Sequence, residues 1–208
     1  LPGTGAPMTA SPVAAAPLAA EPDAPAAGTD KLNVIAMPLQ ATNPEFTSVG
    51  FNAAGLAAVT GPGVKQVLTW NAPVGSYRTY YPSDPESDNF PLVVGGVYRL
   101  ILDSTANTVV SFVGNVPDIG AVSFVLARPA GTGCAINDIS VPLNRSDLID
   151  ASALAASIGN VSQVIEWNAT AGSNRTYYPS DPESDNFPVK IGYPYRLCLL
   201  AGGATQWP

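Results

Sequence analysis

Apolar and polar residues alternate along several short segments of the chain, with the period of two that is typical of half-buried β-strands. The clearest examples are 64–71 and 161–168, while 33–39 is a short apolar strand whose counterpart is 137–143. Two further segments, 92–102 and 189–200, begin with the same alternation and end in an apolar run. Residues that favour turns separate these segments, so the pattern predicts a fold that is mostly β.

One segment has the helical period instead. Residues 146–159 read SDLIDASALAASIG, with apolar side chains at every third or fourth position. Ser146 is placed to cap the N-terminus of this helix, and Gly159 is placed to end it. Residues 47–61 show a weaker version of the pattern, which two glycines interrupt. We therefore expect one short helix in each half of the chain.

The string RTYYPSDPESDNFP occurs twice, at 78–91 and at 175–188, with a spacing of 97 residues (175 − 78 = 97). Self-similarity at a fixed spacing indicates a tandem duplication. The sequence thus predicts an extended arm, residues 1–30, followed by a first unit, residues 31–130, and a second unit, residues 131–208. We expect these units to be two tandem homologous domains, each a small β-sandwich or β-barrel with one short helix.

The two units differ most at their C-terminal ends. After its last predicted strand, the first unit continues with two apolar runs, 107–116 and 121–126, which a PDIG turn joins as in a β-hairpin. The second unit has no such pair of runs after Leu200. Either the second unit lacks a hairpin that the first one has, or the hairpin belongs in front of the second unit and the first is incomplete. In both cases one unit lacks a pair of strands that the other unit has.

Residues 1–30 differ in composition from the rest of the chain. Prolines recur there about every five residues among Ala, Thr and Ser, which excludes a helix and a core of its own. The stretch MTASPVAAAPL carries no charge, and Met8, Val13 and Leu18 could fill an apolar groove. One interpretation is an arm that adds as a strand to another copy, which would propagate head to tail as a filament. The alternative is a flexible tether.

Composition narrows the function. Charged residues make up 12% of the chain, against 46% for hydrophobic residues, and the net charge is −7. Nine basic residues without a cluster argue against nucleic acid as a partner. No apolar run reaches the ~18 residues of a membrane span. Because histidine is absent and no GxSxG motif occurs, we expect no enzyme.

Two cysteines, Cys134 and Cys198, both lie in the second unit. A disulfide between them would stabilise the fold by about 4 kcal/mol on the loop-entropy model, provided that the protein is secreted. The alternative is a pair of buried thiols.

The repeated string carries the acidic motif DPESDN. Its oxygen-bearing side chains make a candidate calcium site in each unit, because calcium prefers carboxylate and amide oxygens. The alternative is a solvated acidic turn held by prolines. The candidate ligands are Asp84, Glu86, Asp88 and Asn89 in the first unit, and Asp181, Glu183, Asp185 and Asn186 in the second.

Two features relate the chain to carbohydrate. Tyrosines surround both acidic loops, as on a sugar-binding face, although tyrosines at alternate strand positions also pack within sheets. Trp70 and Trp167 are most simply core residues. Four sequons for N-glycosylation, all in the second unit, begin at Asn144, Asn160, Asn168 and Asn174.

The order NDISVPL, a helix ending in I-G-x-V, an apolar strand with Trp, a Y-x-P loop and G-x-x-Y-x-L resembles a tandem repeat of secreted and cell-surface proteins of bacteria. The resemblance covers roughly 32–200 and includes SFVGNVP and AVSF. The expected assembly, in which an arm of one copy supplies a strand that another copy lacks, is similar to that of donor-strand pilins. The leading hypothesis is a subunit of an extracellular filament whose partners are copies of itself, with covalent glycans as a further partner. The alternative is a secreted module that binds glycans or a cell wall.

Overall fold

Antiparallel sheets make up most of the regular structure, as the alternating pattern predicts. A computed structural model describes residues 30–84, 86–103, 109–118, 120–181 and 183–208. The strands are β1 (Lys31–Ala36), β2 (Gln40–Ala41), β3 (Val64–Asn71), β4 (Ser76–Tyr80), β5 (Val97–Leu102), β6 (Gly114–Asn115), β7 (Phe124–Val125), β8 (Ala135–Ser140), β9 (Val161–Asn168), β10 (Ser173–Tyr177), β11 (Pro194–Leu199) and β12 (Gln206–Trp207). The helices are α1 (Pro44–Ser48), α2 (Ala53–Thr60) and α3 (Ala151–Ile158).

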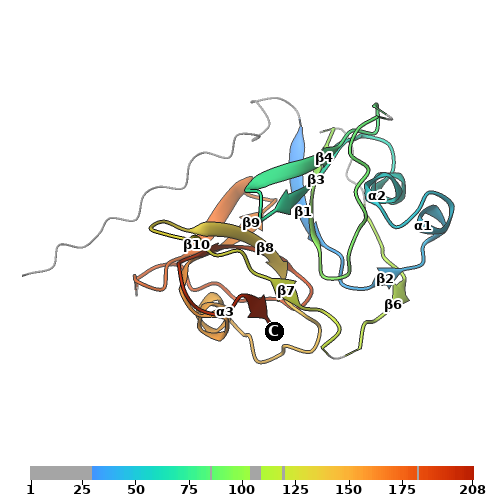
Figure 1. The fold of residues 1–208 in the computed structure, drawn as a ribbon. Helices are drawn as coiled ribbons and strands as arrows, with labels where there is room; N and C mark the ends of the chain where they lie inside the picture. Colours follow the sequence, from blue (N-terminus) through green and yellow to red (C-terminus); the bar gives the residue numbers. More distant parts are fainter. Residues whose placement is uncertain (1–29, 85, 104–108, 119, 182) are drawn as a thin grey trace, which may run out of the picture.

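Two four-stranded sheets form the framework (Figure 1). The first has the order β1-β5-β3-β4, and the second has the order β8-β11-β9-β10 when it is read in the same direction. The last strand of each four-stranded sheet in chain order, β5 or β11, therefore inserts between the first two strands of that sheet. Both sheets are open, with β1 and β4 at the edges of one and β8 and β10 at the edges of the other.

The repeated string begins as a strand rather than as a loop. Its first residues lie in β4 and β10, which pair with β3 and β9. Tight turns join these pairs, and Gly75 (φ 70°) and Gly172 (φ 62°) adopt the left-handed conformation there, which glycine reaches without the steric penalty of a Cβ. Turn-forming residues dominate the rest of the string, so its composition favours a loop over a strand.

Equivalent helices follow the first strand of each sheet. The side chain of Asn52 caps α2 by accepting from the N–H of Gly55, and that of Asp150 caps α3 by accepting from the N–H of Ala153. The prediction of Ser146 as the cap is therefore wrong by about one turn. Because the backbone at Asp150 is extended, the helix cannot begin before it.

The weak helical pattern of 47–61 becomes two short helices, α1 and α2. Gly50 separates them with a φ of 114°. A residue with a Cβ would be strained in this conformation, so the interruption follows from the glycine.

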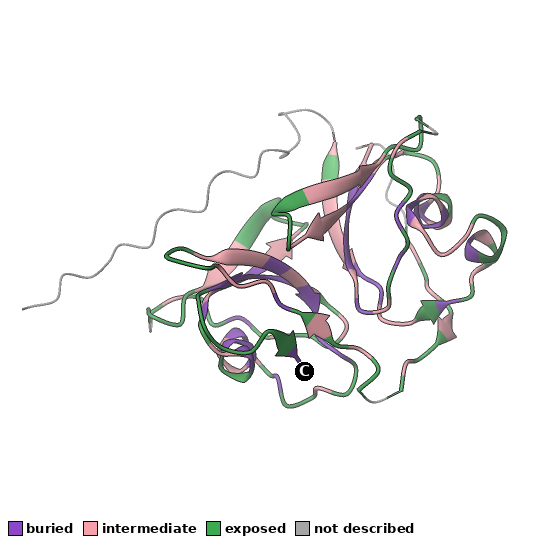
Figure 2. Ribbon diagram, in the orientation of Figure 1, coloured by how far each residue is buried: buried purple, intermediate pink, exposed green. Residues whose placement is uncertain are grey.

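Each sheet packs one face against its own helices and faces the other sheet with the opposite side. In Figure 1, α1 and α2 flank the first sheet and α3 flanks the second. Figure 2 shows buried residues on the strands and on the helix surfaces that cover them. The first core includes Met37, Phe46, Leu56, Val67, Phe90, Tyr98 and Leu100. The second includes Ile139, Leu154, Val164, Phe187, Tyr195, Leu197 and Trp207.

Within the described part of 107–126, the two apolar runs do not pair with each other as the predicted hairpin would. β6, from the first run, pairs with β2, whereas β7, from the second run, pairs with β12 at the end of the chain. Phe112 packs against the first core, and Phe124 and Leu126 pack against the second. The segment therefore bridges the two sheets. Two neighbouring β-runs in a sequence favour a hairpin, but here each run pairs with a strand far away in the chain, which the local pattern does not indicate.

Candidate functional site

The two sheets meet through a reciprocal pair of tryptophan hydrogen bonds. The indole N–H of Trp70, at the end of β3, donates to the carbonyl of Ile136 in β8 at 2.7 Å. The indole N–H of Trp167, at the equivalent place in β9, donates to the carbonyl of Leu32 in β1 at 3.0 Å. Both tryptophans were expected in cores, but both are half-buried at this junction.

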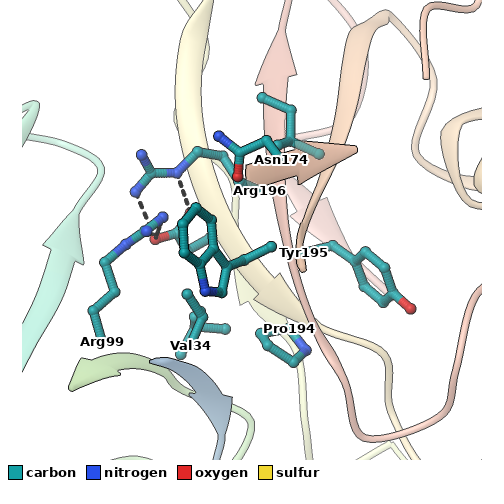
Figure 3. A pocket seen from close by; sticks show the side chains of 10 residues that line it. Val34, Arg99, Asn174, Pro194, Tyr195 and Arg196 are labelled. Carbon is teal, nitrogen blue, oxygen red and sulfur yellow. Dashed lines mark hydrogen bonds and ion pairs between the residues drawn. The ribbon is translucent and has the colours of Figure 1, made fainter. Parts of the chain in front are cut away.

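An ion cluster lies beside the tryptophans. Arg196 binds Asp138 through two hydrogen bonds, of 2.7 and 2.9 Å, and their side chains are 8% and 6% exposed. Arg99 approaches the same carboxylate at 3.8 Å, and Figure 3 shows both guanidiniums directed towards it. The guanidinium of Arg196 also lies over the rings of Trp70 and Tyr77 and donates to the Tyr77 hydroxyl. No sequence motif marks this cluster, because its members lie on separate strands of both units.

The cavity beside this cluster is small. It measures about 40 Å³ and is lined by residues of both sheets, including Val34, Trp167 and Asn174 (Figure 3). A buried ion pair adds little net stability, because desolvation offsets its attraction, and its best-attested role is to fix how elements register. We interpret the cluster as the contact that sets the orientation of the two sheets.

The acidic loops are held by their own chain. Arg78, in β4, makes two hydrogen bonds to Asp88, of 2.7 and 2.8 Å. Arg175, in β10, binds Asp185 in the same way, at 2.9 and 3.0 Å. In both pairs the arginine hydrogen bond lowers the pKa of the aspartate below its usual value. The guanidiniums also lie over the rings of Phe90 and Phe187, respectively.

Four of the other candidate calcium ligands also accept hydrogen bonds from the backbone of the protein. The side chains of Asp84 and Asp181 accept from the N–H two residues later. Asn89 accepts from the N–H of Ala54 in α2, and Asn186 accepts from the N–H of Ser152 in α3. Glu86 and Glu183 lie exposed in the same loops.

In the part of the chain that the structure describes, no three acidic, cysteine or histidine side chains form a group that could hold a metal ion. The calcium sites stay a prediction, to which the observed contacts lend no support. The loops instead tie the repeated string to the start of each helix.

The cysteine prediction is confirmed. Cys134 and Cys198 form a disulfide that joins the residue before β8 to β11. The corresponding end of β1 carries an ion pair instead, between Asp30 and Lys65. None of the helices among the described residues is long and apolar enough to cross a membrane.

The four sequons differ in accessibility. Asn144, Asn160 and Asn174 are exposed, and Asn168 is half-buried. The side chain of Asn168 accepts from the N–H groups of Thr170 in the following turn and Ala171 beside it. Glycosylation at these positions stays a prediction.

Residues 126–128, at the end of the segment that bridges the two sheets, cover the outer edge of β8. The side chain of Asn137 accepts from the N–H of Ala127 at 2.7 Å and donates to its carbonyl at 2.9 Å. It thus holds both polar groups of one backbone residue, as a neighbouring strand would. Next to it, Arg128 donates to the carbonyls of Gly159, Asn160, Leu200 and Ala204. Leu126 is 3% exposed in the second core.

The first unit has the same asparagine but no such cover. Asn33 pairs with Leu100 in the sheet, as Asn137 pairs with Leu197. Asn137 is 2% exposed, whereas Asn33 is half-buried, and no hydrogen bond of its side chain to another described residue is present.

The core positions beside Asn33 differ in the same way. Three apolar residues of the first unit are only partly buried, while their counterparts are covered: Ile35 against Ile139, Val64 against Val161 and Leu102 against Leu199. We call this area the open end of the first unit.

An open groove lies where β3 and β4 face β7 and β8. Its volume is about 430 Å³, and its lining includes the rings of Trp70, Tyr98 and Phe124. The hydroxyl of Tyr98 accepts from the N–H of Val93, and burial raises the pKa of Tyr98 to about 12. The groove therefore offers the half-buried rings of Trp70 and Phe124, while the hydroxyl of the buried Tyr98 has its partner within the protein.

The predicted contact residues Met8, Val13 and Leu18 lie outside the described residues. Comparisons of the chain with protein-family models, with curated proteins and with solved structures gave no match.

Proposed function

We propose that the protein is a structural subunit of an extracellular assembly, in which copies join head to tail by donation of the N-terminal arm. The observation that carries the proposal is the pair of open sheet edges. β4 and β10 each pair with a neighbour on one side only, and both contain the start of the repeated string. An edge strand presents unpaired backbone groups to which an extended segment can add.

The chemistry of the chain supports the same function. The arginines and aspartates of the acidic loops and the junction bind one another, so these groups are already committed to structural contacts. The disulfide is compatible with an extracellular location. The arm stretch around Val13 carries no charge and offers small apolar side chains for the pockets of a sheet edge. We further infer that the two repeats are separate domains.

Electron microscopy of negatively stained protein tests the proposal. The full chain forms filaments or higher oligomers, and a chain without residues 1–29 stays monomeric. Val13→Asp places a charge within the donated stretch and abolishes assembly, whereas the matched arm variant Ala24→Asp leaves it intact. If the full chain and Val13→Asp are equally monomeric at every concentration, the proposal is wrong.

A second candidate function, binding of glycans, is favoured by the aromatic lining of the groove between β3–β4 and β7–β8. Sugars stack on such rings. Saturable binding of an oligosaccharide by the monomer on a glycan array would favour this candidate over assembly. Binding that appears only with oligomers would leave assembly as the primary function.

A further inference from the structure

The open end of the first unit has a defined counterpart in the second. There, Leu126 packs in the core, and Arg128 binds backbone carbonyls beyond it. Between them, the side chain of Asn137 binds both the N–H and the carbonyl of Ala127, an arrangement that we call the clamp. The clamp needs a residue with both an N–H and a carbonyl, which excludes proline. Asn33 stands at the same position of β1 and makes no such clamp within the described chain.

The sequence before β1 contains the elements of this closure. The chain ahead of β8 reads LARPAGTGC from Leu126 to Cys134. The arm reads LAAEPDAPAAGTD from Leu18 to Asp30, ahead of β1. Both segments begin with Leu-Ala and reach the strand through a proline and Ala-Gly-Thr. The link from Ala19 to Asn33 is four residues longer than the link from Ala127 to Asn137.

We propose that Leu18 and Ala19 close the open end of the first unit within the same chain. Leu18 fills the place that Leu126 occupies in the second core, against Ile35, Val64 and Leu102. The amide of Asn33 clamps the N–H and carbonyl of Ala19. The longer link favours closure within one chain, because short connections are the ones that drive exchange between copies.

The consequence is a division of the arm into two parts. Residues 18–30 belong to the first unit, and residues 1–17 remain for donation to another copy. This inference does not depend on the proposed function, because residues 18–30 would cover the first unit in the same way in a protein that stays monomeric.

Disulfide trapping in the full chain tests the inference. The variant Ala19→Cys with Asn33→Cys is oxidised with the native disulfide present, and the products are separated without reductant. A docked arm holds the two cysteines together, so we expect an intramolecular bond that forms about tenfold faster than in matched controls. The controls are Ala15→Cys and Ala24→Cys, each with Asn33→Cys, because they lie in the same arm but out of register.

Each result bears on the inference. Equal trapping rates in all three variants would show a tether without a register and would overturn it. Cross-links between chains from Ala19→Cys would place the arm of a second copy in the open end, which also contradicts it. Assembly is scored separately on the unmodified chain, so failure of one proposal is distinguishable from failure of the other.

A stability measurement supplies an independent readout. Leu18→Asp puts a charge into the proposed core position, so it lowers the melting temperature, whereas Ala15→Asp does not. In a double-mutant cycle, Asn33→Ala and Leu18→Asp are non-additive, because both remove the same docked segment. Additive effects, or no effect of Leu18→Asp, would refute the inference.

Discussion

The indole nitrogen of Trp70 lies 2.7 Å from the carbonyl oxygen of Ile136, a residue of the other repeat. Trp167 makes the equivalent bond in the opposite direction, to Leu32. Each sheet therefore supplies both the donor and the acceptor of the junction.

Replacing either junction tryptophan with phenylalanine keeps a large ring but leaves a carbonyl without its donor. We expect Trp70→Phe and Trp167→Phe each to lower the free energy of unfolding by about 1–3 kcal/mol, as for other lost buried hydrogen bonds. Chemical denaturation measures this. Trp207→Phe is the matched control, because its indole binds Ser157 within the second unit. The losses of unfolding free energy in the two junction variants are expected to be non-additive when the variants are combined. Either loss is expected to add to that of Trp207→Phe.

The buried cluster predicts a larger effect. Asp138→Asn removes the carboxylate between two arginines, and breaking such a pair costs about 3–5 kcal/mol because a buried charge stays uncompensated. Asp147→Asn is the control, since Asp147 pairs with Arg145 but is 62% exposed. That exposed pair is worth at most about 1 kcal/mol. Equal losses in the two variants would contradict the role of the cluster at the junction.

Removal of the disulfide has its main effect on the second sheet. The double variant Cys134→Ser with Cys198→Ser is expected to lose about 4 kcal/mol of unfolding free energy. Hydrogen exchange locates the change, with β8 and β11 losing protection before β1 and β5. Uniform loss of protection across both sheets would show instead that the two units unfold together.

The acidic loops predict a pH dependence at the acidic end. Because the pKa values of Asp88 and Asp185 are lowered in the folded protein, their ion pairs contribute stability above the usual aspartate pKa. This contribution disappears as the pH falls through the lowered values. Thermal melting between about pH 5 and pH 2 measures it. The double variant Asp88→Asn with Asp185→Asn melts lower at neutral pH and depends less on pH in this range. Unchanged acid sensitivity would rule out these aspartates as its source.

The sequence predicted local structure better than it predicted contacts. The segments 64–71 and 161–168 match β3 and β9, and a short helix follows the first strand of each unit. These elements depend on patterns within a few residues, which a single sequence contains. The position of the cap at Asp150 could not be derived, because both Ser146 and Asp150 are competent caps and the turn before α3 decided between them.

The contacts between the sheets had no local signal. Arg99 and Arg196 occupy positions in apolar strands where a single charged residue is often at a surface, but here both meet Asp138. Arg196 reaches it from the neighbouring strand of the same sheet, and Arg99 reaches it from the other unit. The pairing of β6 with β2 and of β7 with β12 likewise depends on segments far apart in the sequence. Only the equivalence of Trp70 and Trp167, visible in the repeat, pointed to a shared role.

The reciprocal tryptophan bonds have the form of an isologous contact, in which one surface is complementary to itself. A single repeat cut from the chain would carry an indole donor and an unoccupied strand carbonyl on the same face. Two copies of it could satisfy one another in the way that the two halves do here. The protein thus has the geometry of a symmetric dimer joined into one polypeptide. The link lets the halves diverge, so that one carries a disulfide where the other carries an ion pair.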